Sequence, residues 1–214
     1  MKNLINTYIL GNAFDYLPKI LNKSVDLFFT GIPDIDEMGN ISIEEYQHFI
    51  EKALKETNRI VRDEGFAVFC QTDRKMNGTI FLKHYIILKV MLELGFIIKD
   101  YKILVKDSVD KINLYRLNYS HILIFSKNGK IPMEKRKGDY LKDLWVFELP
   151  KNKNFLPIEL CNLVIKTLTQ KGDFVVDPFA GRGTVLKSAK KLGRDYFGTE
   201  IKEEVYNLDF VNNV

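Results

Sequence analysis

One stretch near the carboxyl end of the chain combines an acid with two closely spaced glycines. It runs from Phe174 to Val185 and reads FVVDPFAGRGTV. Three apolar residues predict a short buried strand, Asp177 stands at the end of that strand, and a helical pattern begins at Thr184. Glycine lets a backbone turn sharply and approach a ligand closely, so the pattern is typical of a strand–turn–helix ligand site.

A second strand, expected over residues 196–199, ends in Glu200. An acid in that place suits hydrogen bonding to ribose hydroxyls, as in dinucleotide-binding folds. The glycine-rich turn lacks the lysine of a phosphate-binding P-loop, because the chain reads Arg182-Gly183-Thr184 there. A neutral or cationic adenosine ligand therefore fits this sequence better than a nucleoside triphosphate does.

A second candidate site is the turn Gly31-Ile32-Pro33-Asp34. It follows residues 25–30, a nearly continuous apolar run that is typical of a buried parallel strand. In open α/β sheets, ligands and catalytic groups lie at the carboxyl ends of the strands. We therefore expect this turn to lie near the glycine-rich one.

Segments with the patterns of strands and helices alternate along the chain. Ser42, with Glu45 three residues later, predicts a capped helix, and Gly95 ends a strongly apolar helical segment. The expected strands cover residues 7–10, 25–30, 66–70, 96–105, 121–125, 174–176 and 196–199, and the main expected helices begin near 13, 43, 81, 157 and 184. This alternation predicts an α/β fold, with a parallel or mixed sheet and helices on both faces.

The composition is that of a single soluble globular domain. The chain has 214 residues, 46% hydrophobic and 28% charged, and no apolar run long enough to cross a membrane. It begins without the pattern of a secretory signal, so we expect an intracellular protein, cytoplasmic or associated with the nucleoid or nucleus. Cys70 and Cys161 stand in apolar surroundings and are expected to be buried free thiols. The three histidines are scattered in the sequence, and we predict no metal site.

Residues 127–143 form a basic, loop-like connection. The net charge of +4 permits nucleic-acid binding without arguing for it, so the clustering of charge matters more. The basic residues of this connection are Lys127, Lys130, Lys135, Arg136, Lys137 and Lys142. A solvated basic loop would have the same composition, and both interpretations stay open.

The string Asp-Pro-Phe-Ala-Gly-x-Gly-Thr, followed by residues 193–201 (GRDYFGTEI), resembles the S-adenosylmethionine site of nucleic-acid amino-methyltransferases. The resemblance covers nearly the whole chain, in the β arrangement of the DNA amino-methyltransferases, in which the catalytic half precedes the cofactor half. The segments that carry it further are 9–13 (ILGNA), 25–30 (VDLFFT), 58–61 (NRIV) and 154–160 (NFLPIEL).

The resemblance implies a Rossmann-like, S-adenosylmethionine-dependent methyltransferase in one domain. Residues 1–126 would be the catalytic half, 127–143 a basic loop in place of a target-recognition region, and 144–214 the cofactor-binding half. The cofactor residues that it implies are Asn12, Phe155, Asp177, Pro178, Phe179, Ala180, Gly181, Gly183, Thr184 and Glu200. Asn12 replaces the acid of the family, but it can still form hydrogen bonds.

The catalytic tetrapeptide departs from the family. The family has Asp, Asn or Ser, then Pro-Pro, then an aromatic residue, whereas this chain has Gly31-Ile32-Pro33-Asp34. In the family, the first side chain and a proline-level carbonyl accept hydrogen bonds from the target amino group, and the aromatic ring stacks on the flipped base. Here Gly31 has no acceptor side chain and Asp34 cannot stack.

Two interpretations follow. In the first, the Ile32 carbonyl and the Asp34 carboxylate accept the target amino group, and Phe29 or Tyr115 covers the base. In the second, the pocket is catalytically silent and the chain scaffolds or regulates an active partner. A third possibility is methylation of a protein or small molecule, because a fold does not fix its substrate.

We therefore expect methyl transfer to an exocyclic amino group of adenine or cytosine in nucleic acid, with DNA favoured over RNA. Carbon-5 methylation is disfavoured because the chain lacks a Pro-Cys nucleophile. The short basic loop can bind phosphates through Lys130, Lys135, Arg136 and Lys137 but can read few base edges, so a protein partner or a homodimer would supply target recognition.

Overall fold

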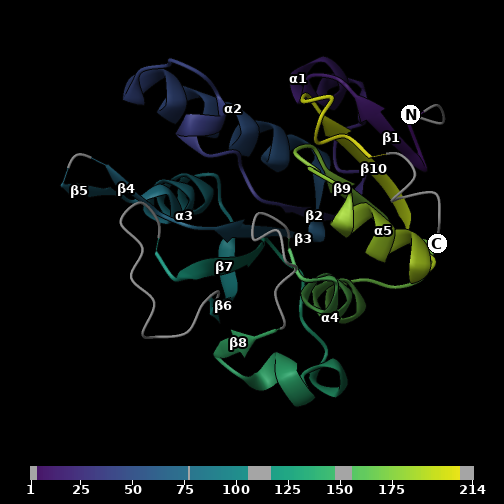
Figure 1. The fold of residues 1–214 in the computed structure, drawn as a ribbon. Coiled ribbons are helices and arrows are strands. Elements are labelled where there is room, and N and C mark those ends of the chain that lie inside the picture. Colours follow the sequence, from purple (N-terminus) through teal and green to yellow (C-terminus); the bar gives the residue numbers. More distant parts are fainter. Residues whose placement is uncertain (1–3, 77, 106–116, 148–155, 208–214) are drawn as a thin grey trace.

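A mixed eight-stranded sheet forms the centre of the molecule in the computed structural model, which describes residues 4–76, 78–105, 117–147 and 156–207 (Figure 1). The strand order is β1-β10-β9-β2-β3-β7-β6-β8. β7 runs antiparallel to both of its neighbours, β3 and β6, and the other pairs are parallel. The strands are β1 (Thr7–Leu10), β2 (Val25–Thr30), β3 (Val61–Gln71), β6 (Ile97–Val105), β7 (Tyr119–Ser126), β8 (Leu144–Val146), β9 (Phe174–Asp177) and β10 (Asp195–Glu200), with a separate hairpin of β4 (Arg74–Met76) and β5 (Thr79–Phe81).

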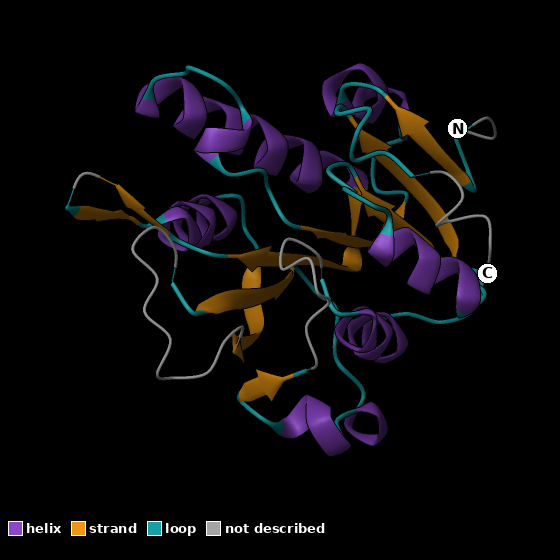
Figure 2. Cartoon of the chain, viewed as in Figure 1, coloured by secondary structure: helices purple, strands orange, loops and turns teal. Residues whose placement is uncertain are grey.

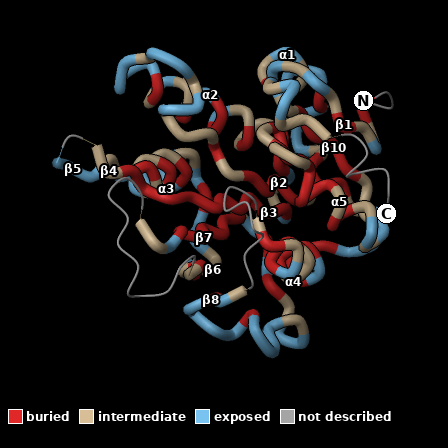
Figure 3. Tube along the Cα trace, in the orientation of Figure 1, coloured by how far each residue is buried: buried red, intermediate tan, exposed pale blue. Residues whose placement is uncertain are grey.

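Helices cover both faces of this sheet (Figure 2). The helices are α1 (Ala13–Tyr16), α2 (Ile43–Ile60), α3 (Lys83–Glu93), α4 (Ile158–Leu168) and α5 (Thr184–Lys191). One core cluster joins α1, α2 and α3 to one face, and a second joins α4 and α5 to the other. Alternate residues of β2 serve the two clusters, with Phe28 in the first and Leu27 and Phe29 in the second. Buried residues accordingly run through the middle of the molecule (Figure 3).

The longest helix begins where the sequence predicts. The Ser42 side chain accepts a hydrogen bond from the Glu45 backbone nitrogen, and the Glu45 carboxylate accepts one from the Ser42 nitrogen. This reciprocal capping satisfies two backbone donors at the start of α2. The buried face of α2, which includes Tyr46, Ile50 and Leu54, covers the strands beside the candidate turn.

The connections reverse direction between β2 and β9, which lie side by side in the sheet. From β2 the chain passes through α2 to β3 on one side, and from β9 it passes through α5 to β10 on the other. Open α/β sheets bind ligands in the crevice outside the carboxyl ends of such strands. The turn after β2 and the turn after β9 therefore lie together at this edge, as the sequence predicts.

Some boundaries differ from those expected. The structure begins α3 at Lys83 rather than at residue 81, because residues 79–81 pair with residues 74–76 as a hairpin. Pro18 limits α1, which passes into a short 3₁₀ helix at Leu17–Lys19. Residues 127–143, expected to be loop-like, include two short 3₁₀ helices, at Met133–Lys135 and Gly138–Leu141. Among the described residues, no helix has the length and apolar character needed to span a membrane.

Candidate functional site

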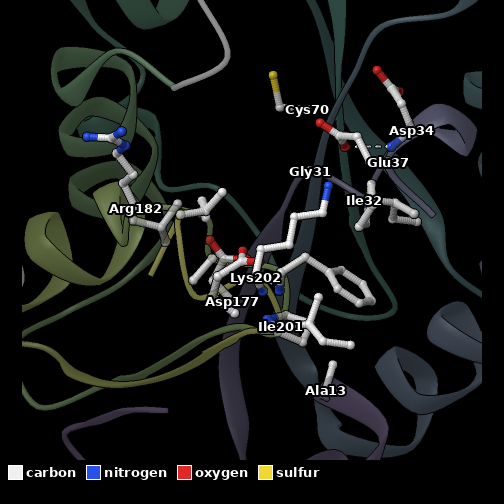
Figure 4. A pocket seen from close by; sticks show the side chains of 18 of the residues that line it. Ala13, Gly31, Ile32, Asp34, Glu37, Cys70, Asp177, Arg182, Ile201 and Lys202 are labelled. Atoms are coloured by element: carbon white, nitrogen blue, oxygen red, sulfur yellow. Dashed lines mark hydrogen bonds between the residues drawn. The ribbon is translucent and has the colours of Figure 1, made fainter. Parts of the chain in front are cut away.

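A cavity of about 960 Å³ lies at the carboxyl edge of the sheet, between the turns that follow β2 and β9 (Figure 4). The first turn contributes Gly31, Ile32, Pro33 and Asp34 to its lining. The cofactor residues expected from the sequence that also line it are Asn12, Asp177, Pro178, Phe179, Ala180, Gly181, Thr184 and Glu200. The structure thus brings both sets into a single space large enough for a nucleoside-sized ligand and a second group.

Asp177 is the buried acid of this cavity. Its Oδ1 accepts hydrogen bonds from the Thr30 hydroxyl at 2.6 Å and from the Phe179 backbone nitrogen at 3.2 Å. Burial raises the pKa of Asp177 to about 7, although both hydrogen bonds act to lower it. The bond from Thr30 crosses from β2 to β9, so it ties the two turns together at the point where the topology reverses.

The glycine-rich turn has the backbone conformation that its glycines permit. Gly181 and Gly183 have φ values of 57° and 76°, in the left-handed region that favours glycine. Within the described part of the chain, no atom lies within 4 Å of a Cβ built on Gly181, so the turn leaves open space beside its backbone. Gly183 immediately precedes α5 and is absent from the cavity lining. The Tyr8 hydroxyl donates to the Gly181 carbonyl and fixes the turn to β1.

In two further cofactor residues expected from the sequence, the side chain accepts a hydrogen bond from a nearby backbone nitrogen. The Asn12 Oδ1 accepts a hydrogen bond from the Phe14 nitrogen at 3.0 Å and caps α1, while Asn12 still lines the cavity. Glu200 ends β10 and accepts from the Lys202 nitrogen at 2.8 Å, so one oxygen of its carboxylate is already engaged. Phe155 lies outside the described residues.

In the turn after β2, the groups that could accept hydrogen bonds from a ligand already accept them from other side chains of this chain. The Lys83 ammonium donates to the Ile32 carbonyl at 3.0 Å and to Asp34 Oδ1 at 2.5 Å. The Tyr46 hydroxyl donates to the Pro33 carbonyl at 2.7 Å. Arg74 lies 3.5 Å from Asp34 Oδ2 and also pairs with Asp36. The Lys83 nitrogen, which has hydrogens to donate, therefore occupies the place that the first of the two interpretations assigns to the target amino group.

Lys83 is held in this place by burial and charge. Its side chain is only 2% exposed, and that of Asp34 is 13% exposed. An ammonium removed from water is costly unless it is paired, so the Asp34 carboxylate and the Ile32 carbonyl together stabilise it there. Lys83 also lines the cavity, so an amino group that approached the same two acceptors would have to displace its ammonium.

The expectation that Phe29 covers the target base is wrong. Phe29 is completely buried in the core cluster beneath α4 and α5, and a base could not reach its ring. Tyr115 lies outside the described residues. Among the residues that the structure describes, the aromatic rings that line the cavity are those of Phe14, Phe49 and Phe179, which contact one another with centroids 5.4 to 6.4 Å apart.

The basic loop does not join this site. None of its described residues lines the cavity, and at its start the Asn128 nitrogen donates to the carbonyl of Asp63 near the start of β3, whereas Cys70 and Gln71 at the end of that strand line the cavity. The intervening strand spans about 25 Å at about 3.3 Å per residue. Lys130, Arg136 and Lys137 are exposed, but the Lys135 ammonium donates to the Thr169 carbonyl at 2.9 Å. The sequence alone could not show that the loop starts at the edge opposite the cavity. That position follows from β7 running antiparallel to β3, so that the end of β7 lies near the start of β3.

Sequence reasoning missed two residues that contact the turn after β2, Lys83 and Tyr46. Both fall within segments with helical patterns, although one signal pointed to Lys83. A lysine in the first turn of α3 faces the positive end of the helix dipole, which disfavours a cation unless an acid is near. Tyr46 carries no comparable signal, because its ring lies on the apolar face of α2 like any core residue.

Comparison with known proteins finds similar sequences. A family model described as DNA methylase, for the N6- and N4-specific group, matches residues 21–210. The orphan methyltransferase M.BamHII of Bacillus amyloliquefaciens is 26% identical, over 86% of this chain and 87% of its own length. The type II methyltransferase M2.MboI of Moraxella bovis is 25% identical, over 92% of this chain and 84% of its own length.

Solved structures share the fold. A DNA modification methylase of Thermus thermophilus, complexed with S-adenosyl-L-methionine, superposes with a TM-score of 0.76 at 23% identity, over 97% of this chain and 92% of its own. The cytosine-N4-specific PvuII DNA methyltransferase superposes with a TM-score of 0.79 at 20% identity, over 93% of this chain and 83% of its own.

Proposed function

This chain belongs to the DNA methylase family of N6- and N4-specific enzymes, and from that membership we propose that it transfers a methyl group from S-adenosylmethionine to an exocyclic amino group of adenine or cytosine in DNA. The observation that carries the proposal is the shared cavity. The glycine-rich turn and the turn after β2 line one space, so a methyl donor on the first and an amino group on the second would meet in it.

The cofactor side of the cavity fits S-adenosylmethionine. The open space beside Gly181 admits a ligand against the backbone, and the buried Asp177 offers a negative charge to a cationic ligand. Glu200 stands at the end of β10, where an acid suits ribose hydroxyls. When bound, S-adenosylmethionine supplies a methyl group that is activated by a positive sulfonium.

On the target side, the residues of this chain orient the amino group and accept its hydrogen bonds. The Ile32 carbonyl and the Asp34 carboxylate face the same ammonium now, so they can face the same amino nitrogen once Lys83 withdraws. Accepting both hydrogens leaves the nitrogen lone pair free for attack on the methyl carbon. The Tyr46 hydroxyl holds the Pro33 carbonyl and keeps the turn in position.

The proposal is tested by incubating the purified chain with S-adenosylmethionine and unmethylated DNA, then digesting the DNA and identifying nucleosides by mass spectrometry. We expect N6-methyladenine or N4-methylcytosine from the wild type and none from Gly181→Val, because a β-branched residue at φ 57° is strained and enters the cavity. Gly172→Val is the matched control, since Gly172 has a similar φ of 83° and is exposed at the opposite edge. Methylation that survives Gly181→Val would contradict the proposed cofactor site.

A catalytically silent subunit is the second candidate, and the position of Lys83 favours it. The chain would then bind S-adenosylmethionine without turnover, and its role would be to scaffold an active protein partner or a second copy that supplies target recognition. Calorimetry separates the two cases, because cofactor binding without any methylated nucleoside would point to the silent subunit.

For DNA contact, we propose that the exposed cations of the basic loop bind phosphates at a distance from the target base. Substituting Lys130, Arg136 and Lys137 by Ala is expected to weaken binding to long duplexes and to reduce the slope of log affinity against log salt by roughly one per lost phosphate contact. The catalytic rate on a short duplex should stay unchanged, since contacts of Asn128 with Asp63 and of Lys135 with Thr169 place this part of the loop at the edge of the sheet opposite the cavity. Lys135→Ala is a separate variant, because its ammonium already binds Thr169. An unchanged affinity and slope in the triple variant would exclude the loop from the DNA surface.

A further inference from the structure

Three side chains that are remote in sequence meet beside the cavity. Asp73 follows β3, His84 lies in the first turn of α3, and His121 lies in β7. His84 Nδ1 is 2.6 Å from Asp73 Oδ2, and His121 Nε2 is 3.4 Å from the same oxygen. One potential ligand atom from each residue lies within 4.8 Å of the others.

The cluster contains a buried nitrogen whose hydrogen-bonding capacity is unused. Among the residues that the structure describes, none forms a hydrogen bond with His121 Nε2, although the side chain of His121 is only 7% exposed. Its other ring nitrogen, Nδ1, is hydrogen-bonded to the Tyr101 hydroxyl at 2.5 Å. Imidazoles that bind metals commonly have this arrangement, in which a second group fixes the ring and leaves one nitrogen for the ion.

We propose that Asp73, His84 and His121 form a binding site for a divalent transition-metal ion of the zinc class. Two imidazoles and one carboxylate are a donor set that zinc prefers, and they leave a fourth position for water. The separations of 2.6 and 3.4 Å from Asp73 Oδ2 bracket the spacing of about 3.3 Å expected between ligands bound about 2.0 Å from a tetrahedral ion. The sequence predicts no metal site, because the histidines come together only through the pairing of Gln71 with His121 and the start of α3.

Binding requires one local rearrangement. The rings of His84 and His121 stack with centroids 3.9 Å apart and an angle of 13° between their planes. A metal ion lies close to the plane of each imidazole that binds it, so two stacked rings cannot share one ion. The His84 side chain, which is 20% exposed, can turn about its Cβ–Cγ bond, whereas His121 is fixed by Tyr101. This rotation breaks the hydrogen bond between His84 Nδ1 and Asp73 Oδ2, and the shared ion would take its place between the two side chains.

The ion would act as a structural clamp on the wall of the cavity. Asp73 directly precedes Arg74, and His84 directly follows Lys83. Both of these cations pair with Asp34. Joining Asp73 to His84 therefore fixes the end of β3 to the start of α3 and holds both cations in place. This role concerns metal binding and local stability, so its test is independent of methyl transfer.

The test titrates Co²⁺ and Zn²⁺ into the untagged, chelator-treated chain of 214 residues. We expect one equivalent of Co²⁺ to give the visible absorption of a four-coordinate site that lacks thiolate bands, and Zn²⁺ to displace it. His121→Ala and His84→Ala should each weaken Zn²⁺ binding by about 100-fold or more, and they should abolish the rise in melting temperature that Zn²⁺ causes in the wild type.

His48→Ala is the matched control, because His48 is exposed on α2 outside the cluster, and this variant should bind Zn²⁺ like the wild type. His84 is the least buried member of the cluster, so His84→Ala is the variant expected to disturb folding least. Circular dichroism checks that each variant is folded. Failure of the folded wild type to bind Zn²⁺ would overturn the proposal. Equal affinity in the wild type and His84→Ala, or loss of binding in His48→Ala, would do so as well.

Discussion

The Lys83→Met variant is expected to transfer methyl groups about tenfold to 100-fold faster than the wild type when DNA is limiting. In the wild type, an incoming amino group must displace the Lys83 ammonium from the Ile32 carbonyl and the Asp34 carboxylate. Hydrogen bonds that involve a charged group contribute about 1.5–3 kcal/mol each, and about 1.4 kcal/mol corresponds to a factor of ten in rate. Methionine has a similar length and no donor, so it leaves both acceptors to the substrate.

This variant also has an expected cost in stability. Removing one partner of a buried ion pair destabilises proteins by about 3–5 kcal/mol, and we expect the lower end because Arg74 remains beside Asp34. Urea unfolding measures this loss, and steady-state assays with labelled S-adenosylmethionine measure the rate.

Lys83→Arg is the control for the rate effect, because it retains a cation and should remain as slow as the wild type or slower. A folded Lys83→Met protein that loses methyl transfer would contradict displacement, and it would show instead that Lys83 holds the turn in its active form. If both proteins bind the cofactor and neither methylates DNA, the silent-subunit alternative is supported.

Local sequence patterns predicted those parts of the fold that depend on local interactions. β1 and β2 begin and end at the expected residues, because each is a short apolar run bounded by turn-forming residues. The capping box of Ser42 and Glu45 defined the start of α2 for the same reason. The start of α3 was misplaced because residues 79–81 form a hairpin with a segment whose pairing no local pattern reveals.

The candidate site was predictable to a similar extent. The residue types at Asp177, Gly181 and Glu200 indicated a ligand turn, and the topology placed them in the cavity. The sequence could not reveal which side chains of the site contact one another. The pairing of Asp34 with Lys83 and the convergence of His84 and His121 link residues that lie far apart in the chain, so they depend on the packing of α3 against the sheet.

The Asp177→Asn variant is expected to fold more stably than the wild type at pH 8 and to bind S-adenosylmethionine at least about tenfold more weakly. Asparagine keeps an oxygen to accept from Thr30 and Phe179, but it carries no charge to bury. A cationic ligand loses an ion-paired contact in this variant, and charged hydrogen bonds contribute about 1.5–3 kcal/mol. A buried carboxylate that opposes folding while it serves a ligand is the pattern of a functional site.

The stability difference should depend on pH in a defined direction. The pKa of Asp177 is about 7 in the folded protein, against an ordinary value of 3.8, so the folded state retains a proton that the unfolded state has lost between these values. Wild-type stability due to this group therefore falls as pH rises from about 4 to about 7 and then levels off, by at most about 4 kcal/mol. Asp177→Asn lacks this titrating group, so the free energy of unfolding of the variant minus that of the wild type should increase through the same pH range. Burying the amide hydrogens of asparagine without acceptors would reduce this difference by the same amount at every pH.

Urea unfolding of both proteins from pH 4.5 to 8, with calorimetry for S-adenosylmethionine at pH 8, measures the two effects. Thr30→Val serves as the comparison, because it removes one hydrogen bond to Asp177 and leaves the carboxylate in place. Its stability should decrease, and its pH dependence should remain and extend to higher pH, because the lost hydrogen bond is one that lowers the pKa of Asp177. If Asp177→Asn were more stable and bound the cofactor as tightly as the wild type, the carboxylate would have no part in binding. If the stability difference did not change with pH, Asp177 would not titrate in the folded protein near pH 7.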